Sequence, residues 1–299
     1  MKDRIKSLCR QRNAVILAHT YQPAEIQDIA DYVGDSYGLS VKAREVTDAE
    51  VIIFCGVTFM AETASILNPG KIVLIPEPSA GCPMADTITA EQLREFKAKH
   101  PGAPVVCYVN STAEVKAESD ICCTSANALK VVASLGDVPE ILFVPDRHLG
   151  RFVERRLGRK LICWDGCCPV HDKIPVQLVK DMKAKYPGHI LMVHPETPAD
   201  IQDEASHVLA TGPMIELARK SSDDKYLVGT EDGIMHALRR ATPKKDFIHL
   251  WDGLRCPEMK LTTLGSVLRS LERMETRIQV PEEIAVKARR AIEAMLRVS

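Results

Sequence analysis

The fold is set by the stretch AVILAHTYQ at residues 14–22. Its first five residues are a continuous apolar run of strand length, and polar residues follow directly. Continuous hydrophobicity predicts a strand that is covered on both faces, as in the parallel sheets of α/β proteins. Two similar runs follow, at Val51–Cys55 and Ile72–Ile75. Helical patterns separate the runs, at Ile26–Val33, Tyr37–Glu45 and Phe59–Leu67.

The same series of elements recurs twice along the chain, displaced by about 85 to 90 residues. Four positions at the ends of predicted strands, here called anchors, recur at matching spacing in all three copies. They are the end of the first strand (His19, Tyr108, His194), the end of a short second strand (Ser36, Ser125, Thr211, each expected to open a helix), the end of the third strand (Val57, Asp146, Glu231) and the end of the fourth (Cys82, Cys168, Cys256). Such agreement predicts three homologous units, each with about four parallel strands.

We therefore expect three three-layer α/β/α domains with small parallel sheets, arranged about a pseudo-threefold axis. Their expected ranges are residues 1–86, 87–171 and 172–258. Residues 259–299 are expected to form a helical tail that packs back on the core. Its helices are predicted at Leu261–Met274 and from Pro281 to about Leu296, since proline suits the first turn of a helix.

Composition narrows the function. A net charge of −1 over 299 residues gives no support for binding nucleic acid or an anionic membrane. The N-terminus does not resemble a signal peptide, and no apolar run reaches the roughly 18 residues of a membrane span. We expect a cytoplasmic protein. Because disulfides are rare in the cytoplasm, the 10 cysteines favour metal binding, redox chemistry or catalysis over a disulfide framework.

Three of the cysteines share a register and are each followed by proline, namely Cys82, Cys168 and Cys256. Zinc could bind three cysteines and a water. A [4Fe–4S] cluster held by three cysteines would instead keep one iron open as a Lewis acid. The repeat alignment selects Cys168 over its neighbour Cys167. The remaining cysteines have no counterparts in the repeats and are expected to pack as small apolar residues: Cys9, Cys55, Cys107, Cys122, Cys123 and Cys163.

Polar residues gather where strands end, which is where ligands bind in open parallel sheets. If the units face inward, these residues line one central cavity. Tyr21 and Glu196 are the best acid–base candidates, each beside a histidine, although Glu196 would also suit a strand-end salt bridge. The three hydroxyl residues could be ordinary helix N-caps. Three helix N-termini at one cavity would also bind a phosphate or dicarboxylate.

Several ordered blocks resemble one family. The clearest are Ala18–Gln22, Gly34–Ser36, Cys82–Ala85, Tyr108–Thr112, Thr124–Ala128, Pro145–Arg147, Cys168–His171 and His194–Glu196. Over nearly its whole length the chain is similar to quinolinate synthase, the A protein of NAD biosynthesis. The resemblance implies three α/β domains and one [4Fe–4S] cluster on Cys82, Cys168 and Cys256, with one open iron. It implies condensation of iminoaspartate with dihydroxyacetone phosphate to quinolinate, phosphate and water.

The resemblance also assigns site residues. Tyr21, Glu196, His194 and His19 would be catalytic. The substrate-binding set would be His19, Ser36, Tyr108, Val109, Asn110, Ser125, His171, His194, Pro195, Glu196 and Thr211. An iminoaspartate-producing enzyme would be a transient partner. The sequence departs from the family pattern at Thr20 and Ala210. Two other hypotheses remain: an aconitase-like hydro-lyase and an iron or redox sensor.

Overall fold

The computed structural model describes residues 1–298, and these residues form three separate four-stranded sheets in which every pairing is parallel. The strand orders are β2-β1-β3-β4, β6-β5-β7-β8 and β10-β9-β11-β12, so each sheet repeats one topology. The strands are β1 Ala14–His19, β2 Tyr32–Gly34, β3 Val51–Cys55, β4 Ile72–Leu74, β5 Val105–Tyr108, β6 Ile121–Cys123, β7 Leu142–Val144, β8 Ile162–Cys163, β9 Ile190–Val193, β10 His207–Val208, β11 Lys225–Gly229 and β12 Asp246–His249.

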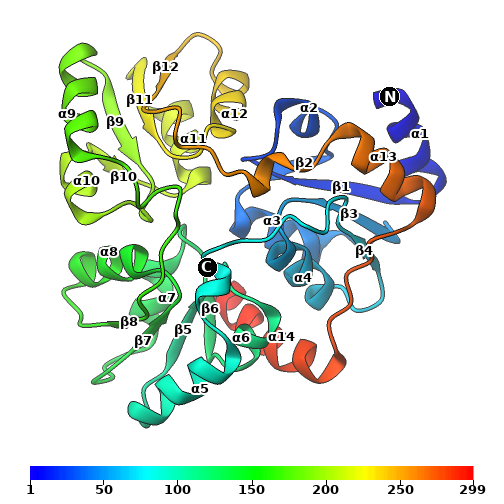
Figure 1. Cartoon of the computed structure of the whole chain (residues 1–299), viewed down its shortest axis with the longest axis horizontal. Helices are drawn as coiled ribbons and strands as arrows, with labels where there is room; N and C mark the ends of the chain where they lie inside the picture. The colour runs from blue at the N-terminus through cyan, green and yellow to red at the C-terminus, as the bar shows by residue number, and fades with distance from the viewer. Residues whose placement is uncertain (299) are drawn as a thin grey trace.

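Helices alternate with these strands, and Figure 1 shows the three units as lobes around a common centre. The α-helices are α1 Lys2–Gln11, α2 Ala24–Gln27, α3 Ser36–Glu45, α4 Thr58–Leu67, α5 Ala90–Lys99, α6 Ala113–Ala117, α7 Ala128–Ser134, α8 Arg147–Leu157, α9 Val176–Lys185, α10 Ala199–Glu204, α11 Thr211–Lys220, α12 Ile234–Ala241, α13 Leu264–Arg273 and α14 Glu282–Val298. Two short 3₁₀ helices lie at Ala85–Thr87 and Glu258–Lys260. The predicted fold class is confirmed. Each sheet lies inside one predicted domain range, but the exact boundaries stay a prediction.

Strand β3 shows why the apolar runs are continuous. Ile52 and Phe54 pack into a core with residues of α3 and α4. The alternate side chains, such as Ile53, pack into a second core with residues of α1 and α13. Since both faces of the strand are covered by helices, no position along it can be polar.

Some predicted bounds were wrong. The segment Ile26–Val33 is not one helix, because α2 stops at Gln27 and Tyr32–Gly34 pairs with β1 as a strand. The fourth strands also stop well before the cysteines, so all three cysteines lie on loops. Helix α13 begins at Leu264, where the Thr263 side chain accepts a bond from the Ser266 amide, and not at Leu261.

One backbone hydrogen bond fixes each cysteine loop and is repeated in all three units. The donor is the amide one residue beyond the third-strand anchor, and the acceptor is the carbonyl two residues before the cysteine. The bonds are Thr58 N to Ala80 O at 2.8 Å, Arg147 N to Gly166 O at 2.8 Å, and Asp232 N to Leu254 O at 2.9 Å. Each cysteine is therefore tied to the carboxyl end of its own sheet.

The two α-helices of the tail contact the first and second units. Helix α13 packs beside α1, and α14 lies against α6, β6 and α4. In Figure 1 the red helix α14 runs between the first and second lobes, partly behind α6. No helix within residues 1–298 is both long and apolar enough to cross a membrane.

Ile292 tests this contact of the tail. It is fully buried on α14, within the large core. Ile292→Ala should lower the free energy of unfolding by about 2–4 kcal/mol, because a buried cavity is left behind. Val286→Ala, on the exposed side of the same helix, should change it by less than about 0.5 kcal/mol. Urea unfolding of both variants measures the difference, and equal losses would contradict this packing.

Candidate active site

A cavity lies where the three units meet, and its empty space, counted together with the open solvent at its mouth, is about 690 Å³. Its lining includes residues that follow the first, second and fourth strands of each unit. Those expected from the sequence are His19, Tyr21, Ser36, Cys82, Tyr108, Asn110, Ser125, Cys168, His171, His194, Glu196, Thr211 and Cys256. The inward-facing arrangement expected from the sequence thus brings thirteen of the fifteen candidate residues to one place.

The other two candidates, Val109 and Pro195, are not among the lining residues. Val109 is buried, and its backbone amide donates to Cys123 O. The carbonyl of Pro195 accepts a bond from Gln202 Nε2. Their substrate-binding role stays a prediction. Asn110, in contrast, lines the cavity, and its side-chain oxygen is buried and has no hydrogen-bond partner among residues 1–298. It is therefore free to accept a bond from a ligand.

Tyr21 lies on the loop after β1, and the loop is held from both sides. Gln27 Nε2 donates to the carbonyls of Thr20, Gln22 and Gly233 at 2.8, 2.9 and 2.9 Å. A side chain at Gly233 would come within 2.6 Å of the Tyr21 backbone, so this close approach of the first and third units requires glycine. The held loop presents the Tyr21 hydroxyl to the cavity.

Glu196 is buried among donors. Tyr108 Oη donates to its Oε1 at 2.6 Å, and His171 Nδ1 lies 2.9 Å from its Oε2. His194 Nδ1 lies 3.4 Å from the same oxygen. Burial alone would raise the pKa of Glu196, but His194 and His171 outweigh it and hold the pKa well below its usual range. The carboxylate is therefore ionised at neutral pH.

The two acid–base candidates are joined by hydrogen bonds. Tyr21 Oη is 2.7 Å from Thr230 Oγ1, which is 2.8 Å from His171 Nε2. Burial lowers the pKa of His171, so its imidazole is neutral and carries one proton. If Nδ1–H donates to Glu196, Nε2 must accept from Thr230, and Thr230 must accept from Tyr21. Thr211 Oγ1 donates to Tyr21 Oη at 2.9 Å and completes the chain.

The hydroxyls near the helix starts are not N-caps. Ser36 and Thr211 are the first residues of α3 and α11, but Ser125 was misplaced, because α7 starts three residues later at Ala128. The cap of α3 is Asp35, whose carboxylate accepts from Gly38 N at 2.8 Å and also from Gly212 N of α11 at 3.1 Å. Since one carboxylate already takes donors from two helix N-termini, the predicted anion site rests more on hydroxyl groups than on free amides.

The three cysteines of equal register all line the cavity. Burial raises the pKa of Cys82 to about 12 and that of Cys256 to about 12, and it raises that of Cys168 as well. Buried thiols with no cation nearby prefer to stay protonated, and a bound metal would reverse that preference. Three half-buried thiols around one cavity, all free of disulfides, thus fit a metal group.

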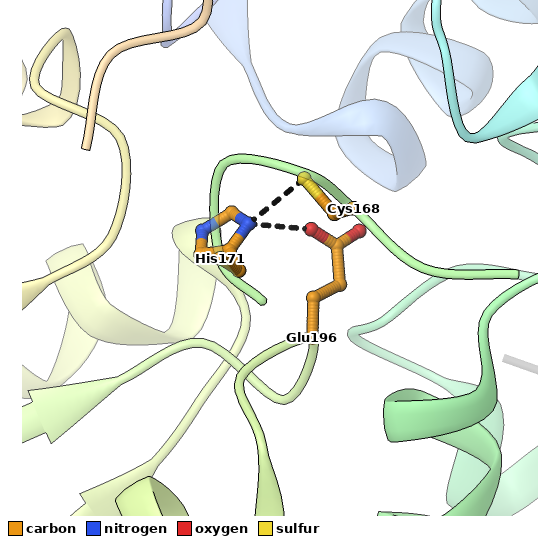
Figure 2. Close-up of side chains that lie close together, drawn as sticks. All are labelled: Cys168, His171 and Glu196. Atoms are coloured by element: carbon orange, nitrogen blue, oxygen red, sulfur yellow. Dashed lines mark hydrogen bonds and ion pairs between the residues drawn. The ribbon is translucent and has the colours of Figure 1, made fainter. Parts of the chain in front are cut away.

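Figure 2 shows how close the cysteine of the second unit lies to the acid–base network. His171 Nδ1 is 3.2 Å from Cys168 Sγ, and Cys168, His171 and Glu196 each offer a ligand atom within 4.8 Å of the others. This trio is a candidate metal group. The remaining cysteines are absent from the cavity lining, including Cys167 beside Cys168.

The sequence patterns missed several lining or supporting residues. Thr230 stands at the end of the third strand of its unit, and Asp35 lies one residue before Ser36. Their positions beside register anchors were visible, but nothing in the sequence could show that Thr230 bridges Tyr21 and His171. That contact joins three units of the chain and depends on how they are packed.

The three-lobed α/β fold and the buried acid–base network define an enzyme whose site lies in a cavity between three domains. The family model described as "Quinolinate synthetase A protein" matches residues 3–297, and the chain belongs to this family. It is 55% identical over 298 residues to "Quinolinate synthase" of Dehalococcoides mccartyi (strain CBDB1), covering 100% of this chain and 98% of that protein. The corresponding enzyme of Geotalea uraniireducens (strain Rf4) is 49% identical over 296 residues, with 99% and 97% covered.

A third relative is similar to the same degree. "Quinolinate synthase 1" of Methanosarcina acetivorans is 49% identical over 295 residues, covering 99% of this chain and 96% of that protein. The chain is thus an enzyme of NAD biosynthesis, as the residue blocks indicated.

Thr230→Val tests the link between Tyr21 and His171, because valine keeps the shape of threonine and removes the hydroxyl. We expect kcat for quinolinate formation to fall by about tenfold or more. Thr262→Val is the matched control, since Thr262 is buried and its hydroxyl has no partner among residues 1–298. Steady-state kinetics with melting curves compare them. An unchanged kcat in Thr230→Val would contradict the link.

The low pKa of His19 predicts how the free energy of unfolding depends on pH. Burial, with Lys260 nearby, lowers its pKa to about 3. The unfolded chain protonates this histidine below about pH 6.5, but the folded protein does not, so stability falls as the pH falls through that window. His19→Asn should remove about 1.4 kcal/mol per pH unit of slope between about pH 6 and 4. Urea unfolding across this range measures it, with His207→Asn on edge strand β10 as control. Equal slopes in the parent and in His19→Asn would refute the assignment.

Proposed function

We propose that the enzyme condenses iminoaspartate with dihydroxyacetone phosphate to give quinolinate, inorganic phosphate and water. The observation that carries this proposal is the hydrogen-bonded chain from Tyr21 to Glu196, which lies in the same cavity as Cys82, Cys168 and Cys256. Joining the two fragments and forming an aromatic ring requires several proton transfers and loss of water, but no net oxidation. An enclosed site with a base, an acid and a means of assisting hydroxide departure suits that demand.

We further propose that Cys82, Cys168 and Cys256 hold one [4Fe–4S] cluster per chain. Bound there, the cluster would supply an open iron that acts as a Lewis acid. The donor set fits, since three half-buried thiols from three loops face one cavity, and no fourth cysteine is among its lining residues within 1–298. Zinc remains the competing metal, because Cys168, His171 and Glu196 lie close enough to share one ion.

The substrates carry carboxylates and a phosphate, and the cavity offers neutral donors. The hydroxyls of Ser36 and Ser125 come from the first and second units, and the hydroxyl of Thr211 in the third unit lines the same cavity while donating to Tyr21 Oη. Ser125 Oγ is 3.2 Å from His194 Nε2, so that pair can orient one anionic group together. His19 stays neutral because of its low pKa, so it binds by hydrogen bonding without adding charge. Substrates would thus be held across the units.

Two residues would move protons. Glu196 is ionised and accepts a proton from a substrate carbon or nitrogen. Tyr21 is a weak acid whose pKa is raised by burial and then by Glu196. It donates from its hydroxyl and can regain a proton through Thr230 and His171 once Glu196 returns a proton to Nδ1 and the imidazole proton moves to Nε2. Because the chain runs between the two residues, the site can return to its starting state without solvent.

Ten free thiols fit a reducing compartment, so we place this activity in the cytoplasm. There an iminoaspartate-producing enzyme would supply the reactive imine. Supplying both substrates to anaerobically purified protein and detecting quinolinate tests the proposal. A dehydrated product from a hydroxy acid would support the hydro-lyase hypothesis instead. A sensor would yield neither product.

The assignment of three cysteines as cluster ligands predicts which serine variants lose the cluster and which one keeps it. Each of the variants Cys82→Ser, Cys168→Ser and Cys256→Ser should lose the brown colour, the stoichiometric iron and sulfide, and quinolinate formation. Cys167→Ser should retain all of them, because this neighbour of Cys168 is not a lining residue of the cavity. Anaerobic iron and sulfide analysis with a visible spectrum measures the outcome, since zinc gives no colour. Full activity in a cluster-free variant would refute the scheme.

A further inference from the structure

Two buried carboxylates lie beside the cysteine loops and have no part in the proton pathway above. Asp146 follows β7 and Glu231 follows β11, and their side chains are 0% and 1% exposed. They hold the same register in the second and third units. Buried carboxylates are costly unless they are fully hydrogen-bonded, so their bonds indicate what they do.

The two carboxylate oxygens of Asp146 accept hydrogen bonds from different segments, one from the start of a helix and one from a cysteine loop. Its Oδ1 accepts from Leu149 N at 2.6 Å, in the first turn of α8. Its Oδ2 accepts from the backbone amide of Cys168 at 3.2 Å. Helix capping explains only the first bond. The second joins the end of the third strand to the loop that carries the cysteine.

Glu231 repeats the arrangement with a longer side chain. Its Oε2 accepts from Gly233 N at 2.8 Å, just before α12. Its Oε1 accepts from the backbone amide of Cys256 at 3.1 Å. Lys260 Nζ lies 2.8 Å from the same oxygen and balances its charge. In both units, a buried carboxylate therefore joins the start of a helix to the backbone amide of a cysteine.

The first unit differs. Val57 stands at this register, so no carboxylate is available. The loop before Cys82 has the amide bond common to all three units, from Thr58 N to Ala80 O at 2.8 Å, and one extra bond from the Thr58 hydroxyl to the same carbonyl at 3.0 Å. Among residues 1–298, no side-chain acceptor is recorded for the Cys82 amide, in contrast to those of the other two cysteines.

We propose that Asp146 and Glu231 are positioning residues that fix the Cys168 and Cys256 loops in the geometry that receives the metal group, a role that no carboxylate has for the Cys82 loop. This inference rests on the cysteines being the cluster ligands, as proposed above. Each carboxylate needs both oxygens as acceptors. An amide in its place turns one acceptor into a donor that faces an N–H group.

Asp146→Asn and Glu231→Gln are therefore the test variants, and Asp232→Asn is the control. Asp232 neighbours Glu231 and pairs with Lys260 and Arg255, but bonds to no cysteine amide in residues 1–298. The anaerobic holoprotein is challenged with an iron chelator, and the rate of iron loss is followed. We expect loss to be about tenfold faster in both test variants, the size of one lost bond to a charged group, and within about twofold of the parent in the control.

A second measurement does not need the cluster. In cluster-free protein, residue-resolved alkylation should speed up at Cys168 in Asp146→Asn and at Cys256 in Glu231→Gln. Cys82 should be unchanged in both and serves as the internal reference. Melting curves of the cluster-free variants are expected to match the parent.

Equal iron-loss rates with equal alkylation would overturn the proposal. So would a collapse of the fold or a uniform rise in alkylation, since the carboxylates would then support the domains in general. A parent protein that binds no iron and sulfide would instead defeat the proposed cofactor, and the alkylation pattern would still decide whether these carboxylates position their cysteines.

Discussion

The structure depends on one backbone hydrogen bond that is made three times. In each unit, the amide just beyond the third-strand anchor binds the carbonyl two residues before a cysteine. The loops carrying Cys82, Cys168 and Cys256 would otherwise be free, because their fourth strands end several residues earlier. With this bond in place, each cysteine stays at the carboxyl end of its sheet, and the three sheets need only face inward for the cysteines to line one cavity.

Burial then determines the chemistry of the cavity. It raises the pKa of the thiols and lowers that of His19 and His171, so these groups are neutral without a bound cation. Glu196 is the exception, because Tyr108 and two imidazoles compensate its charge. An ionised base beside neutral hydrogen-bond donors can accept a proton while those donors bind anionic substrates.

The repeat in the sequence was enough to predict the sheets, the three cysteines and most of the cavity, because register follows directly from residue spacing. It could not place Ser125, since the start of α7 depends on a local turn around Thr124 and Asn127. Nor could it find Thr230 or the second bond of Asp146. Those roles arise from contacts between segments distant in sequence, which spacing does not encode.

The central claim is that three cysteines, one from each repeat, hold a four-iron group with one open iron. Mössbauer spectroscopy of ⁵⁷Fe-labelled, anaerobic protein with and without quinolinate tests it most directly. The account predicts a cluster in which one iron in four changes its spectrum when quinolinate is added. A spectrum in which all irons are unaffected, or a protein that contains zinc and no iron, would contradict it.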